Sequence, residues 1–270
     1  MNTMKRFISA LLLLIMLSSV MTLASCSSGK TDLAYIKDKG EMIIGITYFA
    51  PMNYLEGDKL VGFETEFAEA VCRELGVKPK FQKIDWSAKE TELNAKNIDC
   101  IWNGMTITDE RKENMDISVP YMNNKQVMIV KKGNEDKYTT AVSLKDVKLV
   151  AEKKSAGADV AKTNNFFNLA SYTDVDSQAK VLMEIKSNVA DVGLVDYVMS
   201  IGSIGEGTDY SDLVIVDGKS FADELYGIAF RKNSPETIEA VNNAIAKLRQ
   251  DGTLLKIAEK YKLQDVLIKN

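Results

Sequence analysis

The sequence predicts two three-layer α/β lobes joined by a two-strand hinge, and three observations support this fold class. From residue 41, short apolar runs alternate with helical segments, a rhythm typical of a largely parallel sheet covered by helices. A second rhythm of the same kind follows from residue 147. The chain then closes with two helices, and if these return to the first lobe, the chain crosses between lobes twice, near 125–130 and 224–228, in strand-like segments. Two such strands side by side would form a hinge.

The first half contains its elements in a clear order. Strands are expected at 41–47, 78–84 and 98–104, with helices at 63–75, at 88–96 and from Thr108 onward. In the helix at 63–75, Phe63, Phe67, Val71 and Leu75 form one apolar stripe, and Gly76 is a stop signal. Ser87 with Glu90 predicts a capping box for the second helix.

The second half repeats the alternation. Strands are expected at 125–133, 147–153, 190–195, 212–218 and 225–232, and helices at 157–166, 176–188, 197–203, 236–250 and 253–261. Ser234 and Pro235 are expected as N-cap and first residue of the long helix. We therefore assign 36–126 and 227–270 to lobe 1, and 127–226 to lobe 2.

The first 25 residues read as a secretory signal peptide, because Lys5 and Arg6 precede an apolar stretch at 7–24. A membrane-spanning helix is the alternative, since about 20 apolar residues suffice to span. The segment "LASC" resembles the bacterial lipobox, in which cleavage precedes the cysteine and the Cys26 sulfur receives a diacylglycerol. Two acyl chains anchor a protein stably, and residues 26–35 would then be a lipidated tether.

Composition excludes several classes of function. The 270 residues include no histidine, which removes the commonest general base and imidazole metal ligation. The net charge is −4 and no basic patch is evident, so nucleic acid is not an expected partner. Cys72 and Cys100 fit no zinc pattern; free thiols are favoured over a disulfide, and neither metal nor cofactor is expected.

Arg111 is the first candidate binding residue. Thr108 is a plausible N-cap, and a cation in the first turn opposes the helix dipole at about 0.3–1 kcal/mol. Gly104 allows close backbone approach, and amides near Thr106 lie at a helix start that suits an anion. A bound carboxylate would explain all of this. The alternative is that Arg111 swings into solvent towards Asn114.

Asp196, at the end of the strand "ADVGLV", is the second candidate. It would either cap the following helix or face the cleft and await a cation. With Arg111 on one lobe and Asp196 on the other, the two charges would bracket a zwitterion.

Two further pairs follow predicted strands. Phe49 and Trp86 could line the cleft mouth and stack on a ligand, or belong to the core, to which we assign Trp102. Ser155 and Gly157 could present amides to the same ligand, or form an ordinary strand-to-helix turn.

Four segments in order resemble the polar amino-acid binding proteins of ABC uptake systems: "VGFETEFAEAVCRELG", "DWSAKETELNAKNIDCIWNGMTITDERKENMDISVPY", "ADVGLVDY" and "LYGIAFRKNSPETIEAVNNAIAKLRQDGT". The similarity spans roughly residues 40 to 262. It implies a type 2 periplasmic-binding-protein fold. By this resemblance Arg111 and the backbone at Thr106 hold the ligand α-carboxylate, and Gly104 and Asp196 hold the α-ammonium.

The resemblance also places the ligand side chain. Phe49 and Trp86 fall where two aromatic rings sandwich it, and Asn103 falls at a frequent polar contact. Ser155 and Gly157 fall on the helix start of lobe 2, where "KSAGA" replaces the usual Gly-Thr pair. Several relatives carry an acid where this chain has Ile46, which weakens the expectation of a cationic or amide ligand side chain.

The implied function is that of a monomeric, lipid-anchored, extracytoplasmic protein that captures a free amino acid and delivers it to an ABC permease without acting on it. Cyclohexadienyl dehydratases use the same fold, so an enzyme is one alternative. Its acid would be a residue such as Glu152 or Glu224, and nothing in the sequence marks either. A ligand-presenting sensory module is the other alternative.

Overall fold

A computed structural model describes residues 31–269, and the chain from Asp32 onward forms one compact unit. The predicted signal peptide (1–25) and Cys26 lie outside the described residues. Helix α2 (Asp32–Lys39) begins inside the predicted tether (26–35), and Asp32 accepts a hydrogen bond from Nε of Arg231 at 2.7 Å. The end of that stretch therefore belongs to the folded unit. Within 31–269, no helix combines the length and apolarity needed to cross a membrane.

The first sheet has the strand order β4-β1-β5-β12-β6. Strand β1 pairs in parallel with β4 and β5, whereas β12 pairs antiparallel with β5 and β6. The strands are β1 (Glu41–Ile46), β4 (Lys78–Lys83), β5 (Cys100–Ile101), β6 (Met115–Ile117) and β12 (Ala229–Arg231), and a small hairpin joins β2 (Tyr54–Glu56) to β3 (Lys59–Val61). The accompanying helices are α2, α3 (Phe63–Leu75), η1 (Trp86–Ala88), α4 (Lys89–Asn94), α5 (Asp109–Asn114), α9 (Pro235–Gln250) and α10 (Thr253–Lys260).

The second sheet has the order β11-β7-β10-β8-β9. Strand β8 pairs in parallel with β9 and β10, and β7 pairs antiparallel with β10 and β11. The strands are β7 (Met122–Lys131), β8 (Lys148–Glu152), β9 (Ser171–Val175), β10 (Val192–Asp196) and β11 (Leu213–Tyr226). The helices are η2 (Val142–Leu144), α6 (Ala156–Thr163), η3 (Asn165–Phe167), α7 (Gln178–Lys186) and α8 (Tyr197–Ser203).

Helices cover both faces of the second sheet, as the alternation along β8 shows. Val150 packs in the same buried cluster as Val181 of α7, whereas its neighbours Leu149 and Ala151 belong to a second cluster with Ala158 of α6. Successive side chains of a strand point to opposite faces, so α6 and α7 lie on opposite sides. The fold is therefore two three-layer α/β lobes, as predicted.

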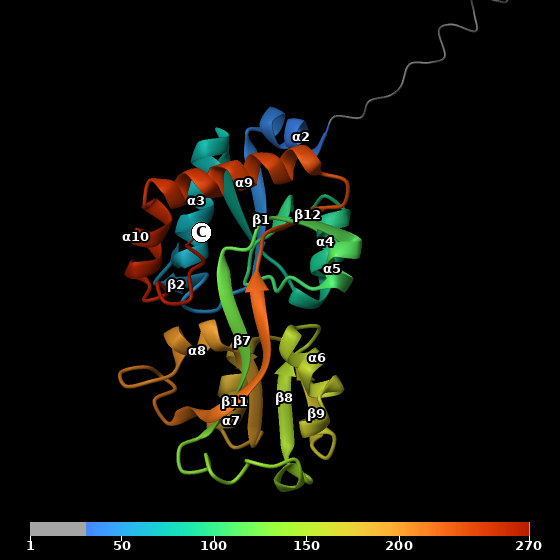
Figure 1. The fold of residues 1–270 in the computed structure, drawn as a ribbon, viewed down its shortest axis with the longest axis vertical. Coiled ribbons are helices and arrows are strands. Elements are labelled where there is room, and N and C mark those ends of the chain that lie inside the picture. Colours follow the sequence, from blue (N-terminus) through green and yellow to red (C-terminus); the bar gives the residue numbers. More distant parts are fainter. Residues whose placement is uncertain (1–30, 270) are drawn as a thin grey trace, which may run out of the picture. The chain divides into compact units, whose positions relative to one another are not determined.

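Strands β7 and β11 form the connection between the sheets. They run antiparallel from the Leu213–Lys131 pair to the Tyr226–Met122 pair, with bulges in between. Figure 1 shows them side by side between the two sheets, and α9 and α10 return to pack on α3. This is the predicted hinge, and the lobe borders at 126/127 and 226/227 remain our proposal.

Local helix signals had mixed outcomes. In the α3 stripe Phe63, Phe67 and Val71 are buried and Leu75 is half-buried, and Gly76 ends the helix at φ 73°, as predicted. The capping box at Ser87 and Glu90 is wrong, because the Asp85 side chain accepts from Ser87 N and a 3₁₀ turn forms before α4 begins. Pro235 does start α9, but the Ser234 side chain makes no cap hydrogen bond.

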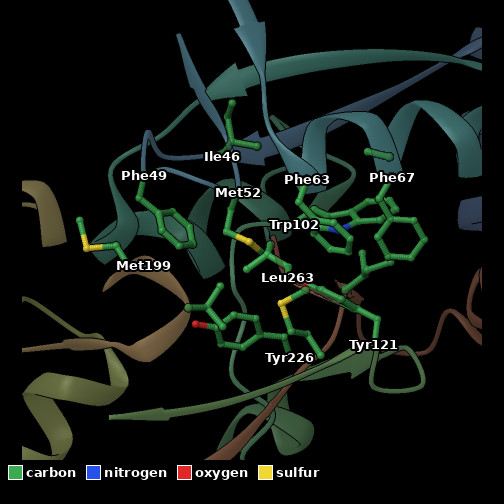
Figure 2. Close-up of a cluster of buried hydrophobic side chains, with 14 of the residues drawn as sticks. Ile46, Phe49, Met52, Phe63, Phe67, Trp102, Tyr121, Met199, Tyr226 and Leu263 are labelled. Carbon is green, nitrogen blue, oxygen red and sulfur yellow. The ribbon is translucent and has the colours of Figure 1, made fainter. Parts of the chain in front are cut away.

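A buried cluster next to the connection fixes the end of the first sheet (Figure 2). Trp102 is fully buried and packs edge-on to Phe67, with ring centroids 5.0 Å apart, which confirms its place in the core. Cys72 and Cys100 are buried free thiols, as favoured from sequence, and burial raises the pKa of Cys72 to about 12.

Candidate functional site

A small polar cavity lies between the two sheets. Its walls come from both: Trp86, Asn103, Gly104, Thr106 and Arg111 from the side of the first sheet, and Glu152, Ser155, Ala156, Gln178 and Asp196 from the side of the second. Most of these residues follow the carboxyl end of a strand or begin a helix, where α/β sheets bind ligands. A wider polar groove shares Arg111 with the cavity and includes Lys89, Glu90, Lys154 and Asp159.

Arg111 points into the protein. Thr108 caps α5 by accepting from Arg111 N at 3.2 Å, as predicted, and the Arg111 side chain is 7% exposed. One guanidinium nitrogen donates to the Thr106 carbonyl at 2.7 Å, which fixes the orientation of the planar fork. The alternative in which Arg111 swings into solvent is therefore wrong.

Asp196 lies across the cavity at the end of β10. It occupies the N-cap position of α8, but its side chain makes no cap hydrogen bond. Its carboxylate instead accepts from the amides of Asn124, at 2.8 Å, and of Gln126 and Gln178. Burial raises the pKa of Asp196, and these amide donors oppose the shift because they stabilise the ionised form.

Glu224 of β11 is a second carboxyl beside Asp196. It accepts from Asn124 at 2.8 Å, from Gln126 at 3.0 Å and from the Thr106 hydroxyl at 3.2 Å. Burial, followed by the charge of Asp196, raises the pKa of Glu224 to about 7. No sequence signal pointed to this role or to the three amides.

Glu152 is a third carboxyl, at the end of β8. It is 5% exposed and lines the cavity, and its Oε1 has no hydrogen-bond partner among the described residues. Burial first, and Asp196 second, raise the pKa of Glu152 to about 8.

The two predicted aromatic residues differ in position. Trp86 lines the cavity and is 6% exposed, and Lys89 Nζ lies 4.6 Å from its ring centroid. Phe49 packs against Gly104, where a Cβ atom would lie 2.8 Å from Cζ of the phenylalanine ring. Figure 2 places Phe49 in the buried cluster that includes Met52 and Tyr226. Its stacking on a ligand remains a prediction.

Asn103 and Gly104 are also engaged within the protein. The Asn103 amide donates to Thr47 Oγ1 at 2.6 Å and accepts from Thr47 N at 2.8 Å. Gly104 N donates to the buried carboxyl of Glu64 at 2.7 Å, and its φ of 55° suits glycine. The Gly104 carbonyl is the group that the predicted ammonium contact would use.

The two residues predicted at the start of α6, Ser155 and Gly157, lie in different surroundings. Ser155 lines the cavity and caps α6 by accepting from Ala158 N at 3.1 Å. Gly157 lies against neighbouring elements, since a Cβ there would be 2.9 Å from Gln126 Oε1 and 3.2 Å from Leu194 O. Packing of α6 on β10 therefore explains Gly157, and a ligand contact at either residue stays a prediction.

The fold and the site together define a two-lobed ligand-binding protein with a charged cavity between its lobes. The family model of the bacterial extracellular solute-binding proteins, family 3, matches residues 42–264, and the chain belongs to this family. Within the described residues, no cluster of three or more histidine, cysteine or acidic side chains is suited to a metal ion.

Individual relatives cover nearly the whole chain. The L-cystine-binding protein TcyJ of Escherichia coli (strain K12) is 31% identical over 86% of both chains. A structure of an ABC uptake transporter substrate-binding protein from Streptococcus pneumoniae with bound histidine has a TM-score of 0.80 at 29% identity, covering 90% of this chain and all of that one. The ancestral amino acid-binding protein AncCDT-1, a precursor of cyclohexadienyl dehydratase, has a TM-score of 0.76 at 31% identity, covering 85% and 98%.

Proposed function

We propose that this protein captures a free L-α-amino acid between its lobes and delivers it to the permease of an ABC importer. The observation that carries the proposal is that Arg111, on α5 beside the first sheet, and Asp196, at the end of β10 in the second sheet, line one cavity. A zwitterion pairs with both charges at once, and its contacts to both lobes favour the arrangement in which the lobes are close together.

The same geometry supports the remaining assignments that we propose. Arg111 offers a planar fork to the α-carboxylate, and Asp196 with the Gly104 carbonyl holds the α-ammonium. Trp86 borders the ligand side chain, and Ser155 contributes to the wall of the second lobe. The relatives named for cystine and histidine binding support an amino acid as the ligand.

We propose no chemistry on the ligand. Glu152 is buried and Glu224 is half-buried, both have raised pKa values, and an acid is what an enzyme on this fold would need. Their raised pKa values have a simpler cause, however, because burial alone shifts a carboxyl in this direction. We further propose that the protein is a monomer anchored through Cys26 on the extracytoplasmic face of the membrane.

A thermal-shift screen of the purified protein against the proteinogenic amino acids, cystine and ornithine tests the function. A ligand that binds only the native state stabilises it by about 2.7 kcal/mol at a hundredfold excess over Kd, so the true ligand raises the melting temperature. Mass spectrometry of the bound molecule should return the unchanged mass. An altered mass would show that the protein is an enzyme and not a binding protein. If no compound raised the melting temperature, the proposal of an amino-acid ligand would be wrong.

A further inference from the structure

One acid in the cavity has no counterpart once an amino acid is bound. The walls carry Arg111, Asp196 and Glu152 as ionisable side chains. An α-carboxylate and an α-ammonium use the first two, and Glu152 is left over. Its Oε1 lacks a hydrogen-bond partner among residues 31–269, and leaving a buried polar atom unpaired costs free energy, so a donor on the ligand would stabilise it.

Glu152 lines the same cavity as Asp196, the proposed ammonium site. Asp196 and Asp85 raise the pKa of Glu152 and Lys89 lowers it, so these three charged groups lie near its carboxyl. Trp86 and Glu152 line the same cavity. A ligand side chain held in this cavity would therefore have both the Trp86 ring and the unpaired oxygen as wall groups.

Lys89 does not satisfy Glu152. Its Nζ donates to the carbonyls of Trp86, at 3.4 Å, and Lys154, at 3.3 Å, and lies over the Trp86 ring. Burial lowers the pKa of Lys89 to about 8, and no ion pair joins it to Glu152. The lysine therefore fastens the two lobes to each other, and the carboxyl stays available.

We infer that Glu152 binds a distal cationic nitrogen on the ligand side chain, a guanidinium or a second ammonium group. This rests on the proposed function and specifies its ligand class. It also revises the expectation drawn from Ile46, which is 1% exposed in the core. The acid for a cationic side chain comes from the opposite lobe, at Glu152.

Binding of such a ligand changes the charge of Glu152. With a pKa of about 8 the carboxyl is mostly protonated at pH 7, and a neighbouring cation favours its ionised form. The proton leaves to solvent as the ligand enters. Asp196, Asp85 and Lys89 face the same carboxyl, so a substitution at Glu152 itself is needed to assign the proton.

Isothermal titration of the purified protein at pH 7 provides the test, in buffers of different ionisation enthalpy. The probes are L-arginine with its neutral counterpart L-citrulline, L-lysine with L-norleucine, and L-cystine for an ammonium beside a carboxylate. We expect one cationic probe to bind about 10- to 100-fold more tightly than the neutral compounds, the range of a charged hydrogen bond. Its binding should release up to one proton, and its affinity should rise between pH 6 and pH 8.

Glu152→Gln keeps the shape and removes the ionisable group. It should abolish the proton release and the preference for the cationic probe, whereas Glu90→Gln in the outer groove should leave both unchanged. Citrulline or norleucine binding as tightly as the cationic probes would overturn the inference, as would proton release that persists in Glu152→Gln. In either case an amino acid still binds, so the proposed function stands; it fails separately if no amino acid binds at all.

Discussion

Asp196 and Glu224 share two amide donors. Asn124 Nδ2 lies 2.8 Å from an oxygen of each carboxyl, and Gln126 Nε2 donates to the same two oxygens. Asp196 ends β10, whereas Glu224 lies on β11, one of the two connecting strands. The buried carboxyl of Asp196 and the half-buried carboxyl of Glu224 repel each other at this distance when both are ionised, and a bound ammonium would relieve this repulsion. The ligand charge is thereby coupled to the strand that joins the lobes.

The first prediction concerns the stability of the ligand-free protein against pH. Glu224 has a pKa of about 7 in the fold against 4.5 in the reference state. Between these values the folded state holds a proton that the unfolded state has lost, so the free energy of unfolding falls as pH rises. Glu224→Gln should remove this loss, which is at most about 3 kcal/mol. Urea unfolding at pH 5 and pH 8 measures it.

The variant should therefore gain stability relative to wild type between pH 5 and pH 8. Glu113→Gln, at an exposed carboxyl, is the matched control and should show no such gain. A wild-type protein whose unfolding free energy rises across this range, with Glu224→Gln parallel to it, would contradict the coupling.

The sequence predicts features that depend on residues close together in the chain better than features that depend on residues far apart in it. The stripe and stop of α3 are local, and Arg111 and Asp196 were found because each follows a strand end. The predicted capping box at Ser87 and Glu90 is wrong because the Asp85 side chain accepts the hydrogen bond from Ser87 N, and a 3₁₀ turn forms there instead. Glu152 and Glu224 gave no signal, because burial of an acid depends on segments that meet only in the fold; Gln126 lies 98 residues from Glu224.

The second prediction separates charge from shape at Arg111. Arg111→Lys keeps the positive charge but loses the planar fork that grips a carboxylate in two places. We expect amino-acid affinity to fall by about 10- to 100-fold, with the melting temperature nearly unchanged. Lys112→Ala is the control, since Lys112 is exposed and pairs with Asp109 at 3.3 Å. Full affinity in a folded Arg111→Lys protein would exclude a bidentate contact.

The third prediction concerns the approach of the lobes. A Cβ at Gly202 of α8 would lie 2.7 Å from Cδ and 2.8 Å from N of Pro51, so only glycine allows this contact. Gly202→Ala should weaken ligand binding tenfold or more, while the ligand-free protein keeps its stability because alanine favours a helix by about 1 kcal/mol over glycine. Titration calorimetry and urea unfolding measure the two effects.

Ser203→Ala tests whether contact or hydrogen bonding matters at this point. It removes only the 3.4 Å hydrogen bond to the Ala50 carbonyl and should have a minor effect. Small-angle scattering should show that ligand compacts wild type and Ser203→Ala but not Gly202→Ala. Equal compaction in all three would show that α8 does not limit closure.

The fourth prediction uses the two tryptophans as reporters. Trp86 lines the cavity, whereas Trp102 is fully buried against Phe67. Ligand should therefore change the fluorescence of Trp86, and Trp86→Phe should abolish the change while Trp102→Phe retains it. Calorimetry shows whether Trp86→Phe has lost ligand binding or still binds the ligand without a change in fluorescence. A ligand-dependent signal that survives in Trp86→Phe would place the ligand elsewhere.

The last prediction concerns the membrane anchor. A diacylglycerol attaches through the cysteine sulfur, so Cys26→Ser should lose lipid labelling and leave the membrane fraction. Two acyl chains give stable anchoring, and without them the folded unit has no described helix that could hold it there. Cells grown with labelled palmitate and then fractionated provide both readouts, with Cys72→Ser as the control at a buried thiol. If the Cys26→Ser protein carries no lipid label but stays in the membrane fraction, the lipid anchor is wrong. The apolar segment at 7–24 would then act as a membrane-spanning helix, the alternative to a cleaved signal peptide.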